Sequence, residues 1–218
     1  MGYRFETLLL AAALLVAAGS CGGNTPRPAC EVSADKRTES CTFREGDFIK
    51  IKETSDFDQF CETNCRRAAD TYIGRVEGLE DLSALSGIVY FNGLTLLDNS
   101  SLKSLEGLDA VGSVRDLVIR SNDKLESLEQ LSNLKNLEGG LKIAANPKIR
   151  SLEPLGEVEK VGSIHILGNN RLKKVSGIGG IEPTQNMALI KINGNDILRT
   201  IQGFNQVEDI PGLRISNN

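Results

Sequence analysis

The residues of this 218-residue chain that could carry chemistry are five cysteines and a single histidine, His165. All five cysteines lie in the first third of the chain. Apart from Cys21, they form two local pairs with ten and three intervening residues: Cys30 and Cys41, Cys61 and Cys65. Four thiolates can hold zinc, but a zinc site of this kind usually shows two CxxC pairs, which are absent here. An even number of cysteines can instead form two disulfides, in any of three connectivities. We therefore expect disulfides and no metal, and leave the pairing open.

Enzyme signatures are missing from the sequence. One histidine excludes both HExxH and a site built from several histidines, and no GxSxG motif is present for a hydrolase. We assign no catalytic residue and no cofactor, and we expect the protein not to be an enzyme. The formal net charge of -4 and the pI near 5.2 also argue against nucleic-acid binding.

The amino terminus has the pattern of a signal peptide. An apolar run of 11 residues extends from Leu8 to Ala18, whereas a membrane-spanning helix needs about 20. Small residues, Gly19 and Ser20, then lead into Cys21. The length of the run and its small-residue end favour a signal peptide over residues 1–20.

The join at Cys21 resembles the bacterial lipoprotein signal. In that family the peptide is cut before the cysteine, which then carries acyl chains, palmitate among them, on its sulfur and its amino group. The resemblance implies lipidation at Cys21, and two or more acyl chains give a stable membrane anchor. Residues 21–29 would be a flexible tether. Gly22 stands where an Asp would retain the protein on the inner membrane, so the resemblance favours the outer membrane, on its periplasmic or its surface face. Export also favours disulfides over zinc.

A hexapeptide pattern, LxIxxN with Leu or Ile at the apolar positions, occurs six times in the rest of the chain. Its asparagines are 23, 24, 23, 26 and 23 residues apart. A second apolar block, such as SLEGL from Ser104, follows each of the first five copies. Two weaker copies precede them, IKIKET from Ile49 and TYIGRV from Thr71. The steady period indicates a repeat protein.

The alternation in LxI has the two-residue period of a strand and is too short for an amphipathic helix. One unit cannot bury its own apolar face, but stacked units form a continuous core. We expect a mainly β, right-handed parallel β-solenoid with coils of about 23 residues. Residues 30–70 would form a cysteine-containing cap with the first coil, and residues 71–218 the repeats.

The repeated asparagine predicts an asparagine ladder. Where a strand ends and the chain turns inward, backbone donors and acceptors are left unpaired, and a stacked amide can satisfy both kinds. Because the asparagine recurs in every coil and amides bind metals weakly, a structural role is favoured over a ligand site. The expected ladder residues are Asn99, Asn122, Asn146, Asn169, Asn195 and Asn218.

The combination of LxIxxN, SLEGL and a period near 23 resembles the receptor L-domain family and, more loosely, leucine-rich repeats. The resemblance covers residues 49–218. It implies the solenoid architecture, and similar repeats occur in bacterial surface lipoproteins. No contact residue of a receptor can be matched by motif, so hormone binding is not implied.

The outward positions of the strands predict a binding face. One column is Thr95, Val118, Lys142, His165, Lys191 and Arg214, and its neighbour is Leu97, Arg120, Ala144, Leu167, Asn193 and Ser216. The positive residues of this face, with His165, would raise the local potential and attract an acidic protein surface or an acidic glycan. Solubility of the sheet is the competing explanation. The candidate binding residues are Arg120, Lys142, His165, Lys191 and Arg214.

The last hexapeptide, LRISNN, ends at Asn218 with no polar cap after it. Solenoids usually protect such an edge. Besides a recognition or adhesion module, the sequence therefore suggests an alternative: a structural envelope component that associates with other copies through its C-terminal rung.

Overall fold

The computed structural model describes residues 48–57, 66–176, 182–183, 189–202 and 212–218. The expected signal peptide and tether lie outside the described residues. So do the lipidation site and the four cysteines expected to form disulfides: Cys21, Cys30, Cys41, Cys61 and Cys65.

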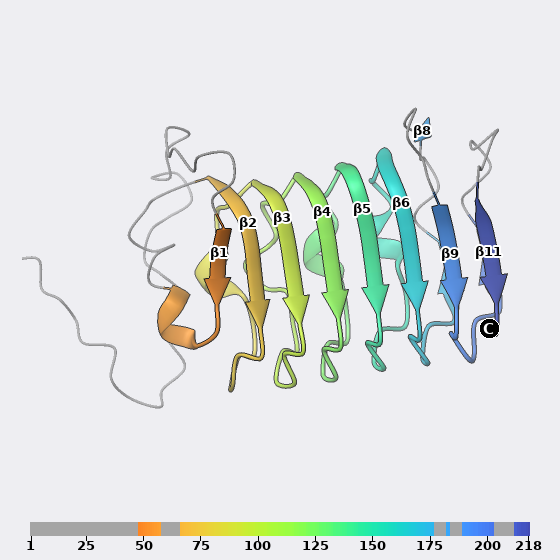
Figure 1. Cartoon of the computed structure of the whole chain (residues 1–218), viewed down its shortest axis with the longest axis horizontal. Coiled ribbons are helices and arrows are strands. Elements are labelled where there is room, and N and C mark those ends of the chain that lie inside the picture. Colours follow the sequence, from red (N-terminus) through yellow and green to blue (C-terminus); the bar gives the residue numbers. More distant parts are fainter. Residues whose placement is uncertain (1–47, 58–65, 177–181, 184–188, 203–211) are drawn as a thin grey trace, which may run out of the picture.

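A single parallel sheet runs the length of the described chain (Figure 1). Its strands follow one another in sequence order, so each coil of the chain adds one strand beside the previous one. The strands are β1 (Phe48–Ile51), β2 (Arg67–Gly74), β3 (Tyr90–Leu97), β4 (Ser113–Arg120), β5 (Asn136–Ala144), β6 (Lys160–Leu167), β9 (Leu189–Asn193) and β11 (Leu213–Ser216); β8 (Glu182–Pro183) also pairs with β6. The fold is the mainly β, parallel solenoid with coils of about 23 residues that the repeat predicts.

The apolar positions of the hexapeptide form the core. Leu117 pairs with Leu141 and Ile119 with Ile143, and all four side chains are at most 2% exposed. Stacking equivalent Leu and Ile side chains on neighbouring strands removes apolar area from water along the whole rod, which a single coil could not do. The alternation of buried and outward residues is therefore the reason that the sequence forms these strands.

The return path behind the sheet contains short elements rather than long helices. Three coils carry 3-10 turns, η3 (Ser83–Leu85), η4 (Glu129–Leu131) and η5 (Glu153–Leu155), and η2 (Thr54–Phe57) follows β1. Two later coils instead pair β7 (Lys174–Val175) with β10 (Thr200–Ile201). The last leucine of each 3-10 turn η3 to η5 is buried, so the second apolar block of each repeat closes the core from behind.

One repeat is a residue longer than its neighbours, and a β-bulge in β5 accommodates the extra residue. Strand β5 has 9 residues where β4 and β6 have 8, and its register shifts between Leu137 and Gly140. The step of 24 residues between Asn122 and Asn146 thus leaves the hexapeptides in register, because the extra residue lies earlier in the strand.

A left-handed backbone turn follows seven strands of the main sheet: β2, β3, β4, β5, β6, β9 and β11. The residue before each ladder position has φ between 52° and 67°, including Asp98, Ser121 and Gly168. Its N–H donates to the next coil, as from Ser121 to the carbonyl of Ala144 at 3.0 Å. This turn directs the following residue, the ladder asparagine, into the core.

The expected boundary between residues 70 and 71 falls inside β2. Strand β2 pairs along its length with β3 and also with β1. The described residues on both sides of that boundary therefore belong to one sheet.

Candidate functional site

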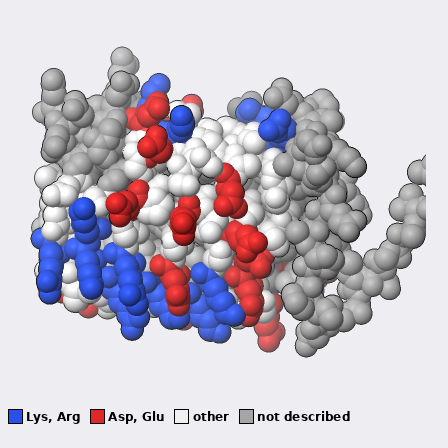
Figure 2. Space-filling model, turned by 180° about the vertical axis from the view of Figure 1, so that it is seen from behind, with Lys and Arg blue, Asp and Glu red and all other residues white. Residues whose placement is uncertain are grey.

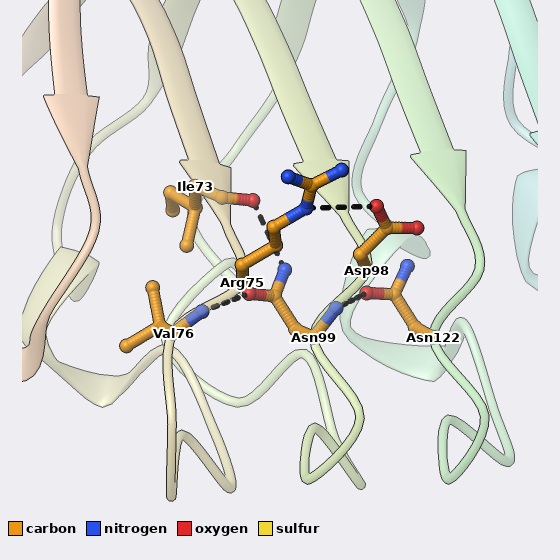
Figure 3. Close-up of polar contacts among 6 residues, drawn as sticks. All are labelled: Ile73, Arg75, Val76, Asp98, Asn99 and Asn122. Atoms are coloured by element: carbon orange, nitrogen blue, oxygen red, sulfur yellow. Dashed lines mark hydrogen bonds and ion pairs between the residues drawn. The ribbon is translucent and has the colours of Figure 1, made fainter.

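The asparagine ladder is built from side chain to backbone hydrogen bonds between successive coils (Figure 3). The Oδ1 of Asn99 accepts from the N–H of Val76 at 3.1 Å, and its Nδ2 donates to the carbonyl of Ile73 at 3.0 Å. The N–H of Asn99 in turn donates to Oδ1 of Asn122 at 3.1 Å. Figure 3 also shows Arg75 Nε donating to the Asp98 carboxylate at 3.3 Å, beside the ladder at the surface.

The same pattern recurs at every later rung and confirms the predicted ladder. The weakly repetitive coil at TYIGRV fits it as well, because Val76 occupies the ladder position there. Five of the asparagines are fully buried: Asn99, Asn122, Asn146, Asn169 and Asn195. Asn218 donates from Nδ2 to the carbonyl of Ile192 at 3.2 Å but is exposed. Since each amide is used by the backbone of its neighbours, the ladder is structural.

The strand register brings the predicted basic residues of the sheet into one line. Lys142 pairs with His165, His165 with Lys191, and Lys191 with Arg214. Neighbouring strands are about 4.8 Å apart, so four positive or titratable side chains stand on four successive strands. We call Lys142, His165, Lys191 and Arg214 the sheet column. Among the described residues, its lysines and arginine form no ion pair.

The pKa of His165 depends on its position in the sheet column. Partial burial lowers the pKa of His165 below its ordinary value, and the positive charges of Lys142 and Lys191 lower it further. The imidazole is therefore biased toward its neutral form at neutral pH. A negative charge brought to the sheet column would oppose this bias and raise the pKa.

The rest of the outward face is less polar than the sheet column. Val118 and Thr95 continue the column toward the amino terminus, and Leu97 and Leu167 lie in the neighbouring column; all four are partly exposed. Ala144, expected to be exposed in that column, is only 6% exposed. Its short side chain lies between the longer side chains of Arg120 and Leu167 on the flanking strands.

Arg120 does not stand in the sheet column. It pairs with Ala144, while Val118, two residues earlier in β4, pairs with Lys142. Its exposed side chain lies at the margin of the basic area. Arg120 stands in the neighbouring column, where the sequence places it, and is a candidate binding residue because both columns face outward.

A second basic area, which the sequence analysis missed, lies at the turns that follow the strands. Figure 2, viewed from behind the sheet, shows that Lys and Arg side chains gather along the lower edge, with some Asp and Glu among them and more above. Three exposed residues, each four positions after a ladder asparagine, define it: Arg150, Lys173 and Arg199. We call these three the turn row. The signal was available in the sequence, since aligning the coils on the asparagines places the three side chains at one position.

Neither a metal site nor a membrane-spanning helix is found in the part of the chain that the structure describes. No group of three or more His, Cys, Asp or Glu side chains there could hold a metal ion. None of its helices has the length and apolar character needed to cross a membrane.

At the last described strand, β11, two apolar side chains are open to solvent. Leu213 is 51% and Ile215 48% exposed, although both occupy positions that are buried in the preceding strands. Strand β11 pairs with β9 and with no other described strand.

The comparisons with known proteins give no relative. No family model matches the chain, and neither the curated proteins nor the solved structures contain a significant match.

Proposed function

We propose that this protein is a non-enzymatic recognition or adhesion module of the bacterial cell envelope, which binds an acidic partner through its sheet face. The observation that supports this most is the register of the sheet column, which aligns Lys142, His165 and Lys191 on adjacent strands. Positive charge concentrated on one face attracts acidic surfaces and speeds encounter even when the whole protein is acidic.

The proposal favours an acidic protein surface over an acidic glycan as the partner of the sheet face. Beside the charges lie partly exposed apolar side chains, among them Val118, Leu97 and Leu167. Protein interfaces combine an apolar centre with a polar rim. A flat sheet face of this composition offers both the apolar contact area and the charge that such a partner requires.

Attachment to the envelope through Cys21 is part of the proposal. The apolar run ending at Ala18, the small residues Gly19 and Ser20, and the cysteine itself support it. An anchor of two or more acyl chains would hold the module at a membrane. Gly22 supports the outer membrane by its resemblance to the sorting position of bacterial lipoproteins.

The single histidine provides a direct test of the sheet face. We would titrate the full-length protein, purified in detergent, with poly-L-glutamate at low ionic strength and follow the ring signal of His165 by NMR. Binding at the sheet column should shift this signal and raise the pKa of His165, and the variant Lys142→Glu with Lys191→Glu should abolish both effects while keeping its melting temperature. An unchanged His165 signal at saturating poly-L-glutamate would refute the proposed face.

A second candidate function is structural assembly through the C-terminal rung, with a second copy of the chain as the occupant. The half-exposed Leu213 and Ile215 on β11 favour it, because burying them against another strand would extend the core. Assembly predicts oligomers that grow with concentration and are lost in Leu213→Lys with Ile215→Lys. Protease cleavage on intact cells would favour recognition of an external partner, whereas protection until lysis would favour assembly in the periplasm.

A further inference from the structure

The turn row forms a continuous line of positive charge on three successive coils. The N–H of Lys173 donates to the carbonyl of Arg150 at 3.3 Å, and the N–H of Arg199 to the carbonyl of Lys173 at 2.9 Å. These backbone bonds hold the three residues one above the other along the solenoid axis. At about 4.8 Å per coil, the row presents one cation per step over roughly 10 Å.

In the earlier coils, charged side chains at the turn-row position form ion pairs with residues of opposite charge. In the later coils they do not, among the described residues. Lys103 lies 2.7 Å from Glu80, and Lys148 lies 2.7 Å from Glu126. Glu80, Lys103 and Glu126 occupy the position of the turn row in the three preceding coils, so the charges there alternate. Glu80 pairs with Lys103, and Glu126 pairs with Lys148 of the next coil. In the described part of the chain, Arg150, Lys173 and Arg199 make no ion pair at all.

Neighbouring residues strengthen this imbalance. Residues 147–151, 170–174 and 196–200 together contain six basic residues, Lys148, Arg150, Arg171, Lys173, Lys174 and Arg199, and one acidic residue, Asp196. The equivalent residues 100–104 and 123–127 contain two of each sign. The positive field reaches Glu126, whose pKa is lowered first by its hydrogen bond and ion pair with Lys148 and further by Arg150 and Arg171.

The shape of the charged area identifies the kind of partner. Lys and Arg side chains gather along the lower edge in Figure 2, with some Asp and Glu among them, and further Asp and Glu side chains are scattered over the mostly uncharged surface above. Glu129, Glu153 and Glu157 are among the exposed acidic residues of the return path. A broad anionic membrane lying against this face would meet those carboxylates and be repelled, whereas a narrow chain can follow the cations alone. Successive cations one coil apart suit a linear chain with one negative charge per monomer.

We propose that the turn row binds a linear acidic polysaccharide of the uronic-acid type, laid along the solenoid axis across three coils. This site is separate from the sheet column and goes beyond the proposed function, because it gives the module a second ligand of a different class. Carboxylates of the polysaccharide would contact Arg150, Lys173 and Arg199 in turn, with Arg171 and Lys174 beside them.

Two variants matched in charge test the proposal. Arg150→Gln, Lys173→Gln and Arg199→Gln remove three positive charges from the turn row, and Lys142→Gln, Lys191→Gln and Arg214→Gln remove three from the sheet face. We would measure binding of the full-length protein to immobilised polygalacturonate at low ionic strength, with the fully methyl-esterified polymer as the uncharged control. Melting temperatures of both variants should stay near that of the wild type, because the altered side chains are outward-facing.

The turn-row variant should lose at least about tenfold in affinity for polygalacturonate, because three exposed charge contacts are removed together. The sheet variant should keep wild-type binding, and the methyl ester should not bind. Equal loss in both variants, or equal binding of the ester, would overturn the proposal. Binding to phosphatidylglycerol vesicles without binding to polygalacturonate would also overturn it, in favour of a lipid surface. Failure of poly-L-glutamate to shift His165 would leave these expectations unchanged, so the two proposals fail separately.

Discussion

The N–H of Asn122 donates to Oδ1 of Asn146, 24 residues further along the chain, at 3.1 Å in the buried interior. Nδ2 of Asn146 donates at 3.0 Å to the carbonyl of Ile119 in the preceding coil. One side chain thus satisfies a donor and an acceptor of the same neighbouring turn. The coils are joined by these bonds as well as by the sheet, and the sheet column and the turn row are positioned by the resulting register.

Removing one rung of the ladder should destabilise the fold. Asn146→Leu leaves the N–H of Asn122 and the carbonyl of Ile119 unpaired and buried, at a cost of about 1–3 kcal/mol each. For a chain of this size the melting temperature should fall by about 4 to 24 °C. Asn170→Leu, at the exposed position next to a ladder residue, is the control and should change it little. Equal melting temperatures for the wild type and Asn146→Leu would contradict a structural ladder.

Gly107 should tolerate no side chain. Its φ is 102°, and a Cβ there would overlap the carbonyl group of Leu82 in the preceding coil. Gly107→Ala combines this clash with an unfavourable backbone conformation, and we expect a loss of more than about 2 kcal/mol in a denaturant titration. Gly112→Ala is the matched control, because its Cβ would come no closer than 3.9 Å to the carbonyl oxygen of Asn133. Similar unfolding midpoints for the two variants would show that the coils do not pack as described.

The titration of His165 should report the charges on either side of it. Lys142→Gln removes one of the two positive neighbours, so the pKa of His165 should rise toward its ordinary value in an NMR titration. The folded-state pKa is below the unfolded one, so the unfolded chain binds more protons in the window between them. This contribution to stability is therefore complete above the unfolded value and is lost as the pH falls. The wild type should lose stability relative to His165→Gln on acidification from about pH 7.5 to 5, and the reverse order would contradict the assigned environment.

Lipidation at Cys21 predicts a change of compartment in one variant. In the native host, Cys21→Ser should abolish incorporation of labelled palmitate and move the protein from the membrane to the soluble fraction, because the anchor is lost. Cys30→Ser serves as the control and should remain labelled. Label retained by Cys21→Ser would disprove the anchor.

Much of the fold follows from local patterns in the sequence. The spacing of the asparagines predicted each ladder position, and the alternation around Lys142 and His165 predicted which side chains face outward. These predictions succeed because a strand has a period of two and the repeat fixes its phase. The weak coil at TYIGRV could be placed only approximately, since Val76 replaces the asparagine that marks the others.

Other features depend on contacts that a linear pattern does not contain. Burial of Ala144 results from longer side chains on its neighbouring strands, and the bulge in β5 appears only when the strand is paired. The turn row was missed because charges in a turn block look like ordinary surface residues. Their significance depends on a comparison with the preceding coils. Glu80 pairs with Lys103 and Glu126 with Lys148, whereas the three residues of the turn row make no ion pair among the described residues.

Site-specific photo-cross-linking in the native host tests recognition through the sheet face most directly. A photoreactive residue at Val118 would lie beside Lys142 on the sheet, and one at the exposed Ser127 would lie on the return path as the control. We predict a cross-linked protein from position 118 that disappears when Lys142→Glu and Lys191→Glu are added, and none from position 127. The same products from both positions, or products unaffected by the two charge reversals, would contradict the account.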